Sequence, residues 1–287
     1  ANGPSDSSKA NSSVSIDAVP PPAASIAVSG NISTDTTWSP SVAQVYLISG
    51  NLTIARSATL TIAPGTIIKF SGGGYIGVDG TLNAIGTAQQ PIIFTSMNDN
   101  SVGGSTGTGS AVAGDWVGIT SSGTVDIESS QINFASCAVC TSAGSSVVMK
   151  GNSITSSING IMVSGSISPT IVSNTITRTT NGRDITCYDC TLPSITNNQS
   201  INNLSPGLSA PFYFYGTFDF TTIFGNTVVG LMNAGMMISG TVVRSSTLAG
   251  PLHYELPGQH LRVALGVTLT IAPGTIIKFS GGGYIGV

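Results

Sequence analysis

Residues 171–176 of this chain read Ile-Val-Ser-Asn-Thr-Ile, and related hexapeptides recur through the middle of the sequence. The relatives begin at Ile127, Met149, Ile195 and Ile223, so successive copies start 22, 22, 24 and 28 residues apart. Each copy has an apolar residue first and Asn fourth, except that Ser130 takes the fourth place in the earliest copy. A pattern repeated at this interval is typical of a solenoid, in which one repeat forms one coil.

Short apolar runs, separated by Gly, Asn or Ser, fill the rest of each coil. One such run follows every hexapeptide, as in Gly160-Ile-Met-Val163 and Phe212-Tyr-Phe214. Strands this short cannot stand alone, but stacked coils let each strand pair with the strands above and below it. The sequence therefore predicts an all-β protein, a parallel β-solenoid with coils of about 22–28 residues.

Four asparagines fall at the same place in successive coils: Asn152, Asn174, Asn198 and Asn226. Asn tolerates the left-handed αL conformation, and its side-chain amide can pair with the amide of the next coil. We therefore expect a structural ladder of asparagines inside a turn, in preference to a polar row that binds a ligand.

A stretch of twenty residues, Thr59–Val78, recurs without a change as Thr268–Val287, 209 residues later. The second copy stops where the first continues, so we expect a piece of a longer array of modules with this period. The tail prediction below rests on a composition rich in Ser, Asn and Ala and on the run Pro20-Pro-Pro22. The expected divisions are a flexible tail or linker (1–24), opening coils (25–122), regular coils (123–240) and the start of a second module (241–287).

Several stretches together resemble a known family. They are LTIAPGTIIKF (60–70), GTLNAIGTAQQPIIFTS (80–96) and Gly114-Asp-Trp116, followed by the coils described above. Over about residues 30–287 the chain is similar to bacterial secreted right-handed parallel β-helix proteins, many of them large repetitive, adhesin-like surface proteins. The resemblance implies a right-handed parallel β-helix, but it does not single out a function, because the same coil is found in adhesins, lyases and inert stalks.

Composition excludes several classes of function. Charged residues are 7% of the chain, against about 25% in an average soluble domain. The nine Lys and Arg residues are scattered and the net charge is −3, so we expect no nucleic-acid partner. No apolar run reaches 18 residues, so we expect no membrane span. A surface of Ser, Thr, Asn and Gly is typical of long β-structures outside the cell, and a chain that begins at Ala1 without a signal peptide suits a mature or trimmed form.

A polysaccharide enzyme on this scaffold needs two or three neighbouring carboxylates, or acids that hold Ca²⁺ beside a Lys or Arg base. Asp126 and Glu128 alternate on one strand, but no acid has a carboxylate neighbour in register one coil away. The remaining place for an active site is the loop Met97–Gly114, whose Asn-Asp-Asn run only faintly resembles a calcium loop and reads better as a flexible insertion. His253 and His260 flank a Pro-Gly turn and are expected at the surface. We expect no catalytic residue, metal or cofactor.

Cys137, Cys140, Cys187 and Cys190 form two Cys-x-x-Cys pairs. The spacing alone suggests a zinc site. The coil alignment, however, places the pairs two coils apart, about 10 Å at the usual strand spacing. That distance disfavours zinc ligation by both pairs and excludes a disulfide between them. A disulfide within each pair, which a secreted location favours, stays open beside free thiols and a metal site.

Residues 211–220 hold six aromatic residues in the run Pro-Phe-Tyr-Phe-Tyr-Gly-Thr-Phe-Asp-Phe. Strand alternation puts Phe212 and Phe214 on one face and Tyr213 and Tyr215 on the other. Outward tyrosines on a flat sheet can stack on sugar rings or cover a loop. Tyr213 and Tyr215 are therefore the candidate residues for contact with a surface glycan.

The function that the sequence favours is a non-catalytic structural or adhesive module that forms an extracellular rod or self-associating fibre. Its partner would be a second copy, head to tail through the open coil ends, or a neighbouring module of the same chain. A carbohydrate-binding module is the alternative, and a polysaccharide lyase or hydrolase is a third and weaker one.

Overall fold

The computed structural model describes residues 23–180, 182–203, 210–230 and 235–287. The predicted tail, residues 1–24, lies outside the described residues except for its last two positions, which open strand β1. Strands dominate the described part of the chain, where the one helical element is the 3₁₀ turn η1 (Phe220–Thr222). No helix in that part is long and apolar enough to cross a membrane.

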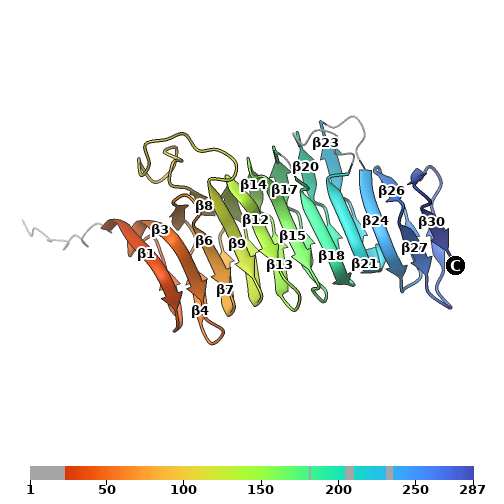
Figure 1. Ribbon diagram of the computed structural model, residues 1–287, viewed down its shortest axis with the longest axis horizontal. Helices are drawn as coiled ribbons and strands as arrows, with labels where there is room; N and C mark the ends of the chain where they lie inside the picture. The colour runs from red at the N-terminus through yellow and green to blue at the C-terminus, as the bar shows by residue number, and fades with distance from the viewer. Residues whose placement is uncertain (1–22, 181, 204–209, 231–234) are drawn as a thin grey trace, which may run out of the picture.

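The strands form three sheets, and all their pairings are parallel, as Figure 1 shows for coils stacked along one axis. The longest sheet holds β1 (Ala23–Ile32), β3 (Ala43–Ile54), β5 (Ile67–Phe70), β6 (Tyr75–Val78), β8 (Ile92–Ser96), β9 (Trp116–Ser121), β11 (Ser130–Asn133), β12 (Ala135–Thr141), β14 (Ser153–Thr155), β15 (Asn159–Ser164), β17 (Thr175–Thr177), β18 (Ile185–Thr191), β20 (Gln199–Ile201), β21 (Phe212–Phe218), β23 (Thr227–Val229), β24 (Gly235–Val242), β26 (His253–Pro257), β27 (His260–Val263), β29 (Ile277–Ser280) and β30 (Tyr284–Gly286). The second sheet holds β2 (Thr36–Trp38), β4 (Thr59–Ile62), β7 (Thr81–Ile85), β10 (Thr124–Glu128), β13 (Ser146–Lys150), β16 (Thr170–Val172), β19 (Ser194–Thr196) and β22 (Ile223–Phe224). The third pairs β25 (Ser246–Leu248) with β28 (Leu269–Ile271).

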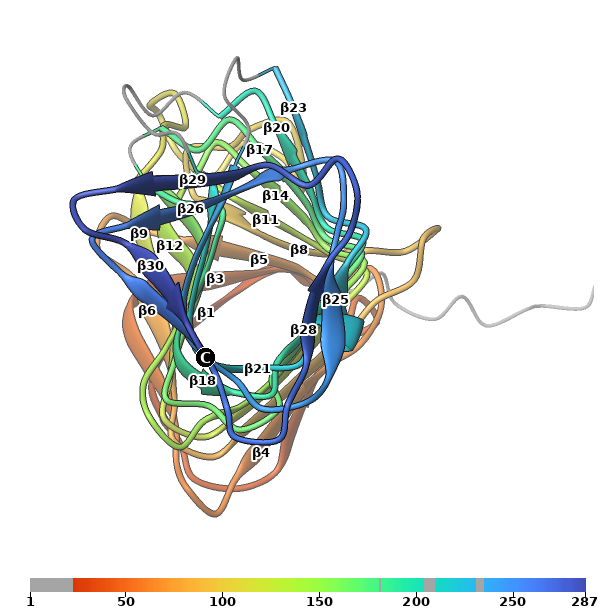
Figure 2. The same cartoon turned by 90° about the vertical axis from the view of Figure 1, so that its right-hand side faces the viewer.

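The longest sheet covers two faces of the solenoid. One face runs from β5 through β8, β11, β14, β17 and β20 to β23, and the other runs from β6 through β9, β12, β15, β18 and β21 to β24. The two faces join where β3 pairs with both β5 and β6, and again where β24 pairs with both β26 and β27. The second sheet closes the third side, so that the view along the axis shows three faces around one core (Figure 2). The predicted parallel β-solenoid is confirmed.

The core consists of like side chains stacked in register from coil to coil. The first residues of the hexapeptides continue such a column, which reads Ile62, Ala84, Ile127, Met149, Ile171, Ile195 and Ile223. All of them are buried, and every neighbour in the column is also a strand partner. Each short strand is thus held by its two neighbours and by apolar burial, because it has too few contacts of its own.

The turn after the second sheet corrects one expectation about the asparagines. The left-handed residue is the one before each ladder position: Gly151 (φ 61°), Ser173 (56°), Asn197 (57°) and Gly225 (68°). The expectation that the ladder asparagines themselves adopt αL is wrong. The turn needs one αL residue to change direction, and the residue after it then points its side chain inward, where it reaches the next coil.

Candidate functional site

The ladder asparagines are buried and joined by repeated hydrogen bonds. Asn152 donates its backbone N–H and its Nδ2 to Oδ1 of Asn174, at 3.1 and 3.0 Å. Asn174 makes the same two bonds to Asn198, and Asn198 makes them to Asn226, all at 2.9–3.0 Å. Each Nδ2 also donates to a backbone carbonyl, such as Met149 for Asn174, at 2.9 Å. With at most 3% exposure, these amides serve the turn and present no polar row to solvent.

Each Cys-x-x-Cys pair is closed by its own disulfide, Cys137 to Cys140 and Cys187 to Cys190. A regular strand would hold such Cα atoms about 10 Å apart, but they lie 6.0 and 5.7 Å apart. The pairing of β12 with β9 and of β18 with β21 shifts register at these places, so each disulfide spans a β-bulge. The first pair is half-buried, whereas Cys187 and Cys190 lie in the core.

The two candidate tyrosines point outward but have different neighbours. The guanidinium of Arg183 lies 4.4 Å from the ring centre of Tyr213 and covers it. Tyr215 instead stacks on Tyr188 of the preceding coil, with ring centres 4.9 Å apart. Tyr188 is 47% exposed and was missed by sequence reasoning, although it lies one coil before Tyr215. The aromatic surface is therefore the pair Tyr188–Tyr215, not Tyr213 with Tyr215.

A shallow hollow of about 330 Å³ adjoins this pair. Tyr215 borders it on one side, Ser239 and Gly240 lie in the middle, and His260 and Arg262 border the other side. A Cβ at Gly240 would come 2.0 Å from the carbonyl oxygen of Gly216 in the neighbouring strand, so only glycine fits there. His260 itself stacks on Tyr284, with ring centres 4.0 Å apart.

His253 is not the exposed turn residue that the sequence predicts. It lies in β26 with its side chain 9% exposed, and its Nε2 is 2.7 Å from Oε1 of Glu255. Gly235 of β24 packs beneath this pair, since a Cβ there would come 2.5 Å from the histidine Nε2. The correction follows from the parallel pairing, which places β26 against β24 and encloses the ring. His260 is exposed as expected.

Asp126 and Glu128 do share the outer face of β10, and Lys150 joins them. Lys150 is the strand partner of Glu128, and its Nζ lies 2.9 Å from Oε1 of that residue. Oδ1 of Asp126 is buried and has no hydrogen-bond partner in the described part of the chain. Burial, and then the charge of Glu128, raise the pKa of Asp126 above its ordinary value. Lys150 was missed by the sequence analysis, although it follows Glu128 by one coil length of 22 residues.

The loop between β8 and β9 is organised by hydrogen bonds, contrary to the flexible insertion expected. The buried Lys69 donates its Nζ to the carbonyls of Asp99 and Gly104, both at 2.8 Å, and to Oγ1 of Thr106 at 3.0 Å. Burial would raise the pKa of Asp99, but hydrogen bonds from Ser101 and Thr95 outweigh it, so this pKa lies below its ordinary value. The loop binds an ammonium of its own chain.

Metal-ligand geometry is not found in this part of the molecule. Among the described residues, no three His, Cys, Asp or Glu side chains are placed to hold one ion. The two disulfides also remove all four cysteines as ligands.

Two family models match the chain. Residues 92–247 match the model described as a right handed beta helix region, which is more than half of the chain. The chain belongs to the right-handed β-helix family. Residues 30–147 of this β-helix protein also match a pectate-lyase like beta helix domain. No curated protein and no solved structure matches it.

Family membership establishes the handedness of the coils and leaves the chemistry to the individual sites. The β-helix protein presents three surface features: the hollow beside Tyr188 and Tyr215, the carboxylate pair with Lys150, and the end coils. Of these, the end coils can be compared directly with a covered copy of the same sequence.

Proposed function

We propose that this β-helix protein is a non-catalytic structural module that builds an extracellular rod by stacking coil on coil, with a second copy or a neighbouring module as its partner. The proposal rests on the repeated twenty residues, which occur once inside the solenoid and once in its last coils. An identical sequence in two environments reveals which neighbour its side chains are suited to.

The inner copy is covered by the coils that follow it. Phe70 is fully buried and stacks on Trp116, with ring centres 3.9 Å apart. Its counterpart Phe279 is 51% exposed. In the same way Ile62 is 1% exposed and its counterpart Ile271 is 47% exposed. The surface of the last coils is therefore complementary to a further β-helix coil, because that is what covers the same side chains inside the molecule.

The first coil offers a matching surface at the other end. Ile26, Val28 and Ile32 of β1 pack against the core but are only partly buried. In the described part of the chain β1 pairs with β3 alone, so its other edge has free backbone donors and acceptors. An open strand edge is a template for pairing with another chain, and contact between unlike ends extends without closing.

The test is the size of the full chain in solution as its concentration rises, with electron microscopy of the same samples. Light scattering should show growing particles, and images should show fibres one solenoid wide. Phe279→Glu should abolish this growth, whereas Phe224→Glu, on an outer face and 54% exposed, should leave it unchanged. A chain that stays monomeric at every concentration, or equal effects of the two variants, would overturn stacking through the ends.

A carbohydrate-binding function is the second candidate, and the pair Tyr188–Tyr215 favours it. The stacked rings stand beside a hollow that also carries Gln259, His260 and Arg262, and this combination of an aromatic face with polar groups suits a sugar ring. Binding to a glycan array that is lost in Tyr188→Ala and Tyr215→Ala, but kept in Tyr75→Ala, would support it. An array without signal would leave the structural proposal alone.

A further inference from the structure

The asparagine ladder ends at Asn226 with two unused donors. At each earlier rung the backbone N–H and one Nδ2 hydrogen point to Oδ1 of the next asparagine. Asn226 receives the bonds from Asn198, and its Nδ2 donates to the carbonyl of Ile195 at 2.8 Å. Within the described chain its backbone N–H and its second Nδ2 hydrogen have no acceptor, although the residue is only 3% exposed.

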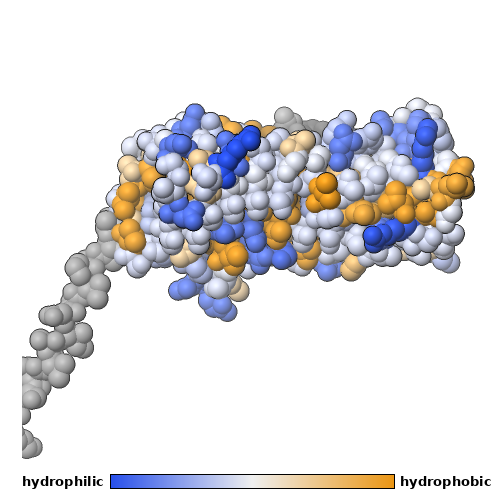
Figure 3. Space-filling view, turned by 90° about the horizontal axis from the view of Figure 1, so that it is seen from below, coloured by the Kyte–Doolittle hydropathy of each residue, from blue (hydrophilic) through white to orange (hydrophobic). Residues whose placement is uncertain are grey.

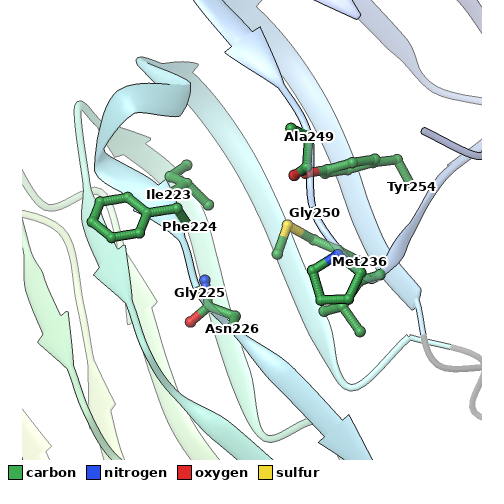
Figure 4. A pocket seen from close by; sticks show the side chains of 10 residues that line it. Ile223, Phe224, Gly225, Asn226, Met236, Ala249, Gly250 and Tyr254 are labelled. Atoms are coloured by element: carbon green, nitrogen blue, oxygen red, sulfur yellow. The ribbon is translucent and has the colours of Figure 1, made fainter. Parts of the chain in front are cut away.

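A small pocket lies at this end of the ladder. Figure 4 shows Gly225 and Asn226 on one side of it and Met236, Ala249 and Tyr254 on the other. About 20 Å³ of it is open to the centre of a water molecule, and a single water needs roughly 10–15 Å³ by that measure. Tyr254 donates its hydroxyl to the carbonyl of Ala249 at 2.6 Å and keeps lone pairs that can accept.

We infer that this pocket is a binding site for one water molecule, whose oxygen takes the place of the missing next rung. Four times along the ladder, the same pair of N–H groups binds a single amide oxygen. A buried donor without an acceptor costs about 1–3 kcal/mol, so a site with two such donors and room for one oxygen retains a water.

The sheet topology explains why the ladder needs a water at this rung. The second sheet ends at β22, immediately before Asn226, and the third sheet begins at β25. The segment Ala249–Leu252 lines the pocket where the next rung would stand, and its sequence Ala-Gly-Pro-Leu contains no asparagine. The water therefore joins the hydrogen-bonded turn of one coil to the next coil across this break.

The experiment is a crystal structure of the full chain at a resolution that shows ordered water, combined with water-to-amide NMR transfer. We expect a water oxygen about 2.7–3.2 Å from both N and Nδ2 of Asn226. We also expect transfer from a long-lived water to these protons, and none to the corresponding protons of Asn174. A pocket without density, or a protein oxygen bound to both donors of Asn226, would overturn the inference.

The variant Asn226→Asp separates the water from the ladder itself. Its carboxylate still accepts from Asn198 but has lost the Nδ2 donors, so the fold should persist while the water loses its side-chain contact. Retention of the water at an unchanged distance from the side chain would contradict the assignment. Asn152→Asp, at the opposite end of the ladder, is the matched control and should leave this water in place.

Discussion

At the scale of single residues, the ladder shows how a turn can be stabilised without charge. Every Oδ1 accepts two hydrogen bonds and every inner Nδ2 donates two, so the buried amides have no unpaired group until the last rung. Buried polar groups that are fully paired cost little, whereas breaking one partner leaves the other unsatisfied. Substitution effects should therefore depend on the position along the ladder.

Asn174→Asp should destabilise the protein more than Asn226→Asp. The inner substitution removes the bonds that Nδ2 gives to Met149 and Asn198 and opposes oxygen to oxygen. The outer one removes only the bond to Ile195 within the protein. We expect losses of about 3 and about 1.5 kcal/mol in the free energy of unfolding, measured by chemical denaturation. Equal losses would contradict the ladder as the cause.

Asp126→Asn should stabilise the protein at neutral pH and have little effect in acid. The pKa of Asp126 is raised in the folded state by burial and by Glu128, so the folded protein binds its proton more tightly than the unfolded chain does. Its contribution to stability is thus present at low pH and lost as the pH rises through the folded pKa. The difference in melting temperature between variant and wild type should grow over that window. A difference independent of pH would contradict the assignment.

At the scale of elements, the disulfides explain two irregular strands. Chain-entropy arithmetic for a closed loop of four residues gives about 2 kcal/mol for each bond. We expect the half-buried pair Cys137–Cys140 to be reduced first under native conditions, because Cys187 and Cys190 are almost inaccessible. Alkylation followed by mass spectrometry would show the order. Simultaneous reduction of both pairs would mean that global unfolding, and not local access, controls the reaction.

The repeated sequence supplies a matched pair of lysines for the loop between β8 and β9. Lys69→Met should cost about 2–3 kcal/mol and expose the loop to hydrogen exchange, because the carbonyls of Asp99 and Gly104 lose their charged donor. Lys278→Met, in the identical sequence but exposed, should change stability by less than about 0.5 kcal/mol. Similar losses for the two variants would show that the ammonium does not anchor the loop.

At the scale of the whole molecule, stability should vary along the solenoid axis. Each coil contacts only its neighbours, so the interior coils have two partners and the end coils have one. Leu60 is fully buried, whereas its counterpart Leu269 is only partly buried. For the monomer at low concentration, we expect amide exchange to be slowest from β11 to β18 and fastest in β28 to β30. Uniform protection would indicate a single cooperative unit.

The sequence by itself determined the coil. Its hexapeptides recur at the coil length, and stacking makes a one-dimensional repeat into one-dimensional contacts, so the column from Ile127 to Ile223 and the asparagine positions could be predicted. The tertiary structure decided what lies between coils and around loops. Examples are the bulges under the disulfides, Arg183 over Tyr213, the enclosure of His253 and the anchoring of the loop by Lys69. These depend on irregular turns and side-chain directions, which bring together residues at separations that no repeat specifies.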